Sequence, residues 1–140
     1  MTRDALLTRW EETGSKLVQL ADAIPEDRYA FRPTPDVRSV AEQLRHVAFW
    51  NDYAAATLRG ETPDAAANEL PERTHRSRAA ILAALRASVD AARTALAAER
   101  PMDADADTLV AFLEHAGEHY GQLVVYARLC GVVPPASREA

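Results

Sequence analysis

Apolar residues recur every three or four positions in four stretches of the chain, which is the spacing of an amphipathic helix. The first stretch covers residues 4–23, and Pro25 closes it. Its expected core positions are Leu6, Trp10, Leu17, Leu20 and Ile24. A loop with three prolines follows over residues 25–38, and we expect Tyr29 and Phe31 to hold it against the helices.

The second stretch has a defined start. Ser39 and Glu42 stand three positions apart, which is the pattern of a capping box with Ser39 as the N-cap. The expected core positions are Val40, Leu44, Val47, Ala54 and Leu58. Arg59 and Gly60 are typical of a helix end, and a polar loop is expected over residues 61–72.

The third stretch covers residues 73–99, and Pro101 ends it. It is rich in alanine, the residue with the highest helix propensity. Its expected core positions are Ile81, Leu85, Val89, Ala92 and Leu96.

The fourth stretch covers residues 108–129 and ends before Gly131, which is followed by two prolines. We expect residues 136–140 to form a frayed tail. A short acidic run just ahead of this stretch favours a helix N-terminus through the backbone dipole. The run is Asp103, Asp105 and Asp107, and the expected core positions are Leu109, Phe112, Ala116, Leu123 and Ala127.

Four amphipathic helices of about 20 residues, with no strand-like alternation, predict an all-α four-helix bundle. The chain has 140 residues, which predicts a single domain over residues 1–140. The connections that precede the second and third helices are long. They permit crossover connections in place of a simple up-and-down order.

The net charge of −5 argues against a protein that binds nucleic acid without sequence preference, because such binding needs a basic face. No apolar run approaches the ~20 residues that a membrane span requires. The start of the chain lacks the apolar segment of a signal peptide. The single cysteine, Cys130, excludes a disulfide within the chain. We therefore expect a cytoplasmic protein that binds neither nucleic acid nor membrane.

Candidate chemistry lies in the fourth stretch. His115 and His119 are four positions apart, so their side chains project from the same side of one helix and can reach one metal ion. A metalloprotease would need Glu directly after the first histidine, and Ala116 stands there instead. From the residues alone, a surface pair that binds nothing is the alternative.

His46 is the candidate third ligand, and its helix face also carries Phe49, Trp50 and Tyr53. The alternative for His46 is a histidine at the edge of the core, hydrogen-bonded to a neighbouring helix. The fourth histidine, His75, stands among arginines and is expected to be solvated at the start of the third helix.

Two motifs resemble the DinB-like family of YfiT-type metalloenzymes. They are Ser39-x-x-Glu42-x-x-x-His46 and His115-x-x-x-His119-x-Gly121-Gln122. The resemblance spans nearly the whole chain, and the weaker matches at Arg32-Pro33 and at residues 131–135 agree with it. Two departures affect the expected pocket rim: many relatives carry an aromatic residue where Arg38 stands and a basic residue where Tyr120 stands.

The resemblance implies an up-down-down-up bundle, which is often a homodimer. It implies that His46, His115 and His119 bind a divalent ion, commonly zinc or nickel. Three histidines leave at least one coordination position open, which is the pattern of a catalytic site. An open position can hold a water molecule and lower its pKa, or keep a thiol deprotonated.

Three functions follow as hypotheses. The first is an S-transferase or isomerase that depends on a low-molecular-weight thiol, and the second is a metal-dependent hydrolase with Glu42 or Glu118 as its base. The third is a non-catalytic module that dimerises or senses a ligand. The candidate residues around the metal are Glu42, Tyr53, Glu118 and Gln122.

A charged thiol would need a cationic partner, and Arg38 and Arg45 are close enough in sequence to supply it. Cys130 lies eleven positions beyond His119, or roughly 16 Å along a helix, so it cannot join the same metal site. We expect Cys130 to be a small buried apolar residue.

Overall fold

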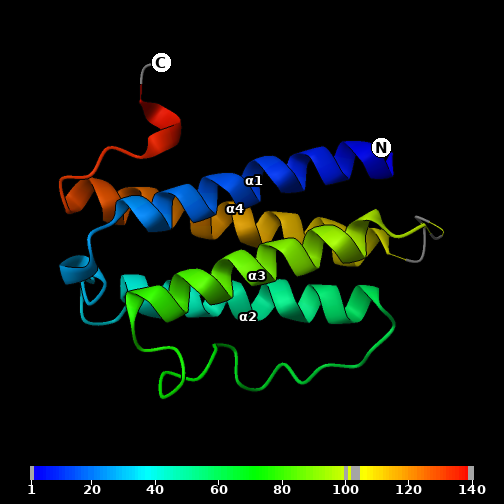
Figure 1. Cartoon of the computed structure of the whole chain (residues 1–140), viewed down its shortest axis with the longest axis horizontal. Coiled ribbons are helices and arrows are strands. Elements are labelled where there is room, and N and C mark those ends of the chain that lie inside the picture. The colour runs from blue at the N-terminus through cyan, green and yellow to red at the C-terminus, as the bar shows by residue number, and fades with distance from the viewer. Residues whose placement is uncertain (1, 100, 102–104, 139–140) are drawn as a thin grey trace.

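The computed structural model describes residues 2–99, 101 and 105–138. These residues form four helices, α1 (Arg3–Ala23), α2 (Val40–Leu58), α3 (Arg78–Ala97) and α4 (Ala106–Leu129). Two short 3-10 turns, η1 (Glu26–Arg28) and η3 (Pro135–Ser137), complete the regular structure, and no strand occurs in the described ranges. The prediction of an all-α four-helix bundle is confirmed (Figure 1).

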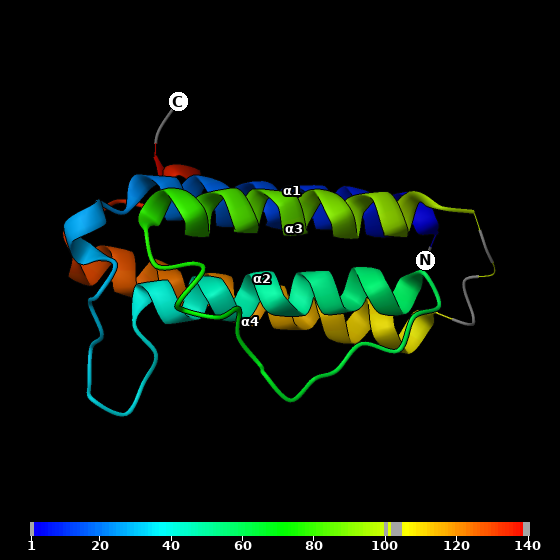
Figure 2. The ribbon, with the colours of Figure 1, turned by 60° about the horizontal axis from the view of Figure 1, so that its bottom comes forward.

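Contacts between side chains fix the relative directions of the helices. Arg3 at the start of α1 donates to the carbonyl of Leu96 at the end of α3, and Arg78 at the start of α3 donates to Asp22 at the end of α1. The two helices are therefore antiparallel. Figures 1 and 2 show α1 and α4 running in one direction and α2 and α3 in the other. The long segment between α2 and α3 carries the chain back along the bundle, so α3 can run parallel to α2.

The centre of the bundle is built around Trp10, which is fully buried. Its ring lies 4.3 Å from that of Phe112 between centroids, and its indole N–H donates to the carbonyl of Val89 at 3.1 Å. Gly14, one turn later on α1, lies so close to α3 that an added Cβ would stand 2.6 Å from Cγ1 of Val89. A close approach of α1 and α3 therefore depends on Gly14.

The expected core positions are buried with one exception, because Val89 is half-buried at the margin of the core. The expected anchoring of the proline-rich loop is also present. Tyr29 is buried and its hydroxyl donates to the carbonyl of Ala21 at 2.7 Å. Phe31 packs edge-on against Tyr126 with ring centroids 6.0 Å apart.

Helix ends follow local capping. The predicted capping box of α2 is present: Ser39 Oγ accepts from the N–H of Glu42, and Glu42 accepts from the N–H of Ser39. The predicted start of the third helix at residue 73 is wrong, because Ser77 caps a helix that begins at Arg78. That helix ends at Ala97 rather than at residue 99, and α4 begins at Ala106, two residues earlier than expected.

The expected frayed tail is partly ordered. Residues 135–137 form η3, which lies against α1, and Pro134 is buried. Residues 139 and 140 lie outside the described residues, as does Asp103 of the predicted acidic run. Asp105 occupies the N-cap position of α4, and Asp107 lies in its first turn.

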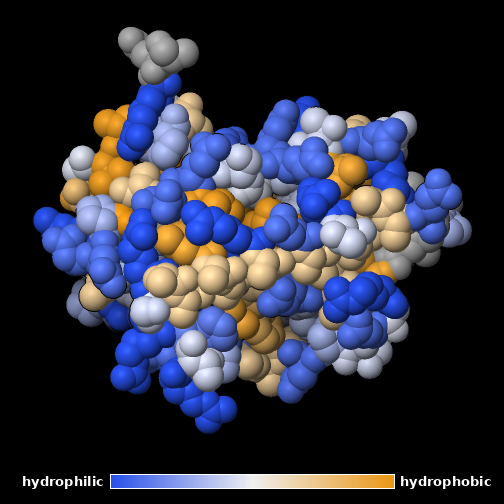
Figure 3. Space-filling model, viewed as in Figure 1, coloured by the Kyte–Doolittle hydropathy of each residue, from blue (hydrophilic) through white to orange (hydrophobic). Residues whose placement is uncertain are grey.

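The outer face of α3 is apolar without being bulky. Figure 3 shows a pale apolar band over this helix, where Ala79, Ala83 and Ala87 are exposed. None of the described helices has both the length and the apolar character that crossing a membrane requires.

Candidate metal centre

The structure brings the three predicted histidines together between α2 and α4. His46 Nε2 lies 3.0 Å from His115 Nε2 and 3.1 Å from His119 Nε2. Their candidate ligand atoms all lie within 4.8 Å of one another. His46 and His119 are buried and His115 is half-buried, so the cluster is largely shielded from solvent with one side open.

Hydrogen bonds fix which nitrogen carries the proton in two of the rings. His46 Nδ1 lies 2.7 Å from the carbonyl oxygen of Asn68, and His119 Nδ1 lies 2.8 Å from Oε1 of Gln43. A carbonyl oxygen can only accept, so each Nδ1 must carry the proton and donate it. The Nε2 atoms of His46 and His119 are then both acceptors and cannot bond to each other.

These converging lone pairs fit a cation. A tetrahedral ion with bonds of about 2.0–2.1 Å would separate its ligand atoms by about 3.3 Å. That is close to the 3.0 and 3.1 Å that separate His46 Nε2 from the Nε2 atoms of His115 and His119. Histidines that hold a metal usually donate their other N–H to a carbonyl or carboxylate, as His46 and His119 do here. The residues present could therefore hold one divalent ion.

The electrostatic environment keeps the three rings neutral. Burial is the main cause that lowers the pKa of each, to about 4 for His115 and to about 3 for His119. The Arg38 charge lowers all three pKa values further. Neutral imidazole is the form that binds metal, so the site is ready for an ion at neutral pH.

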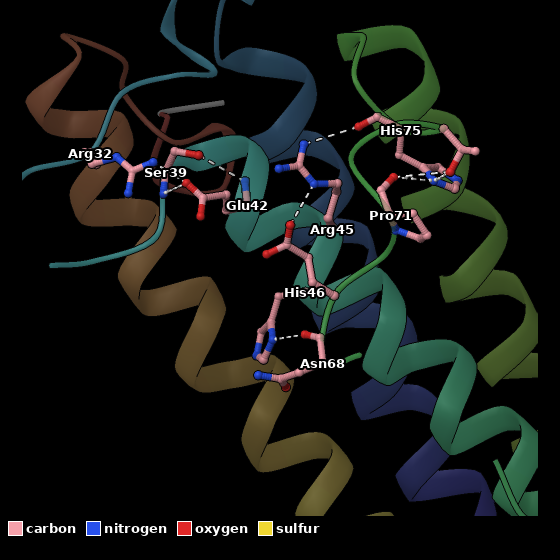
Figure 4. A network of polar contacts seen from close by, with 10 residues as sticks. Arg32, Ser39, Glu42, Arg45, His46, Asn68, Pro71 and His75 are labelled. Carbon is pink, nitrogen blue, oxygen red and sulfur yellow. Dashed lines mark hydrogen bonds and ion pairs between the residues drawn. The ribbon is translucent and has the colours of Figure 1, made fainter. Parts of the chain in front are cut away.

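Asn68 is a site residue that the sequence analysis missed. Its φ of 58° is in the left-handed region, which asparagine tolerates better than most residues. In that conformation its carbonyl accepts from His46, and its side-chain Oδ1 accepts from the indole N–H of Trp50 at 2.7 Å. The loop between α2 and α3 thus orients a ring on α2 (Figure 4).

Arg45 attaches this loop to α2. It is buried, and its guanidinium donates to Glu69 at 2.9 Å and to the carbonyl of His75 at 3.2 Å (Figure 4). Its own carbonyl accepts from the N–H of Leu70 at 3.3 Å. The donors of Arg45 therefore stabilise the loop that supports His46.

Gln43 is the second residue that the sequence analysis missed. It lies on α2 one turn before His46, and only 1% of it is exposed. Its spacing of three positions from His46 was the available signal, since such residues share a helix face. The contact with His119 comes from another helix and could not be inferred from that spacing.

The four other candidate residues lie at different places. Glu42 belongs to the capping box and pairs with Arg32. Glu118 is exposed on α4. Tyr53 and Gln122 each line a pocket beside the histidines.

One pocket is lined by aromatic residues, and the candidate metal ligand His115 lies in its wall. It has a volume of about 430 Å³, and its lining includes Trp50, Tyr53, Phe112 and His115. The rings of Trp50 and His115 lie 6.0 Å apart between centroids. An apolar group bound there would lie directly beside the histidine cluster.

A second pocket is polar and lies on the other side of Gln43. Its volume is about 650 Å³, and its lining holds two arginines, two acids and two glutamines: Arg32, Arg38, Asp36, Glu42, Gln43 and Gln122. Gln43 also contacts His119, so it separates this pocket from the cluster by a single side chain.

Cys130 and His75 lie in surroundings that differ from the predicted ones. Cys130 is half-buried at the C-cap of α4 rather than buried, and burial raises the pKa of its thiol. His75 is half-buried in the loop before α3 rather than solvated at the helix start, and its ring contacts Thr74 and Pro71.

Comparison with known proteins places these features in a family. No curated protein matches the chain. The sequence profile of the DinB superfamily matches residues 9–123, a range that includes all three histidines and most of the four helices. The chain belongs to the DinB superfamily.

Proposed function

We propose that the chain is a metal-dependent transferase or isomerase that uses a low-molecular-weight thiol. The observation that supports it most is the position of the histidine cluster, which has the aromatic pocket on one side and, beyond Gln43, the polar pocket that contains Arg38. His46, His115 and His119 would hold zinc or nickel and leave a coordination position open. A divalent ion bound there would keep a thiol in its thiolate form.

The residues of the chain have separate roles in this proposal. Asn68 and Gln43 orient two of the rings so that their Nε2 atoms face each other, where they would be ligands of the ion. The aromatic pocket would take the apolar electrophile and exclude water from it, with Trp50 and Tyr53 in its wall. The polar pocket, with Arg38 in its wall, would take the remainder of the thiol.

A hydrolase has less support from the same residues, because it needs a general base beside the bound water. Glu42 is engaged with Ser39 and Arg32, and Glu118 is exposed on α4. A non-catalytic module is the third possibility. The homodimer implied by the family resemblance stays a prediction, for which light scattering is the direct measurement.

The experiment uses protein loaded with nickel or cobalt and titrated with 2-mercaptoethanol. The proposal expects a thiolate-to-metal absorption band, lost in His115→Ala and retained in the matched control His75→Ala. It also expects transfer of the thiol to 1-chloro-2,4-dinitrobenzene with release of chloride.

Three results contradict the proposal in different ways. No absorption band with any thiol would remove the thiol chemistry. Hydrolysis of 4-nitrophenyl acetate that depends on His115, without thiol transfer, would favour the hydrolase. A bound metal without either reaction would favour the non-catalytic module.

A further inference from the structure

Arg38 lies in the wall of the polar pocket, which Gln43 separates from the histidine cluster, and it forms no ion pair with a described residue. It directly precedes the N-cap of α2, is half-buried, and lines the polar pocket. The Tyr126 hydroxyl donates to its carbonyl at 2.8 Å, which ties the backbone of Arg38 to α4. Its guanidinium makes no hydrogen bond or ion pair with any residue that the structure describes.

The other cation of this pocket is already neutralised. Arg32 forms an ion pair with Glu42, the acid that completes the capping box. Asp36, an exposed acid, also lines the pocket and forms no ion pair with a described residue, so the unpaired positive charge in the lining is that of Arg38. This charge is close enough to the cluster to lower the pKa of all three histidines.

A second unpartnered donor lies in the same wall. Only 1% of Gln43 is exposed to solvent, and its Oε1 accepts from His119. Its amide N–H groups have no acceptor among the described side chains or backbone. A buried donor without an acceptor is costly, so the Gln43 amide favours a ligand that brings acceptor oxygens into this pocket. The half-buried guanidinium of Arg38 favours a ligand with a negative charge.

We propose that Arg38 and the amide of Gln43 bind the carboxylate of an anionic thiol, so that the chain prefers thiols that carry a carboxylate. The inference rests on the proposed function, since it names the class of thiol that the site would select. A planar guanidinium can bind a carboxylate through two parallel hydrogen bonds, and an amide N–H can add a third. The thiol's sulfur would then be directed toward the histidine cluster.

The test compares two small thiols on the cobalt-loaded protein, 3-mercaptopropionate and 2-mercaptoethanol, through the thiolate-to-metal absorption band. In the wild type we expect the carboxylate thiol to bind at least about tenfold more tightly. In Arg38→Gln the ratio of the two dissociation constants should fall to near one. Equal affinities in the wild type, or a ratio that survives in Arg38→Gln, would overturn the proposal.

Two further variants control for charge and for folding. Arg9→Gln removes an exposed arginine of α1 and should keep the wild-type ratio. Gln43→Glu keeps an acceptor for His119 but replaces the amide with a negative charge, so it should favour the uncharged thiol. A wild-type ratio in Gln43→Glu would contradict the role of the amide.

A thiol-free ligand separates this inference from the proposed function. Glutarate is titrated into the zinc-loaded protein while the Nε–Hε signal of Arg38, assigned by its absence in Arg38→Gln, is followed by NMR. A saturable shift without a thiolate band for any thiol would keep the carboxylate site and remove the thiol function. If both thiols give thiolate bands with equal affinity and glutarate does not shift the Arg38 signal, the thiol function would stand and the carboxylate site would be refuted.

Discussion

The carbonyl oxygen of Asn68 lies 2.7 Å from Nδ1 of His46, although the two residues are 22 positions apart and Asn68 lies in a loop. The contact directs the other nitrogen of His46 toward His115 and His119. The loop between α2 and α3 is therefore part of the metal centre, and its backbone conformation at Asn68 affects metal binding.

Replacement of Asn68 tests this relationship. The backbone of residue 68 has a φ of 58°, a conformation that alanine disfavours, and Asn68→Ala also removes the acceptor for Trp50. The carbonyl of residue 68 should therefore move away from His46. We expect metal affinity to fall by about 10-fold to 100-fold, the usual effect of losing such a partner. Competition with a chromophoric chelator measures it. Asn68→Gly, which tolerates the same φ, is the matched variant and should lose less; equal affinity in Asn68→Ala and wild type would contradict this role.

Acid should destabilise the metal-free protein in a defined pH range. The pKa values of His46, His115 and His119 are lower in the folded chain than the usual value of 6.5. Below about pH 6.5 the unfolded chain therefore binds more protons, and the free energy of unfolding falls as the pH falls. The effect continues toward pH 3, where His119 becomes protonated in the folded state as well.

Urea unfolding of the metal-free protein at pH 7, 6 and 5 measures this dependence. We expect a loss on the order of 4 kcal/mol between pH 7 and pH 5 from His115 and His119 together. The variant with Gln at all three positions lacks the titrating groups and should change much less. A wild type whose stability stays level over this range would contradict the assignment of neutral, buried rings.

The centre of the bundle depends on Trp10. Trp10→Ala removes a fully buried ring that packs against Phe112 and donates to Val89, so the free energy of unfolding should fall by about 3–5 kcal/mol. Urea unfolding monitored by circular dichroism measures the loss. Val125→Ala, at a position that is 54% exposed, should change stability by no more than about 0.5 kcal/mol. Similar values for the two variants would be inconsistent with this core.

The features that the sequence predicted are those decided by local spacing or by a recognisable motif. The capping box of Ser39 and Glu42 involves residues three positions apart, so its pattern is visible in the chain itself. The four helices could be predicted because apolar residues keep a helical spacing over about 20 residues in each of them. The three histidines belong to two motifs that are far apart in the chain, and the family resemblance was the reason to expect them in one site. The structure places them together.

The features that were missed depend on contacts between distant parts of the chain. Asn68 supports His46 through its backbone, which no side-chain pattern reveals. Gln43 is one of several polar residues of α2, and its importance comes from His119 on another helix. The third helix was predicted to begin five residues too early, because the polar residues before Ser77 are compatible with a helix and Ser77 lacks a Glu partner of the capping-box kind.

We expect His46, His115 and His119 together to hold one divalent ion. Metal content by mass spectrometry on untagged protein tests it most directly, with wild type, the His115→Ala/His119→Ala double variant and His75→Ala compared after reconstitution with zinc or nickel. We expect about one ion per chain in wild type and in His75→Ala, and almost none in the double variant. Wild-type protein without metal, or a double variant that retains it, would show that these histidines are not the ligands.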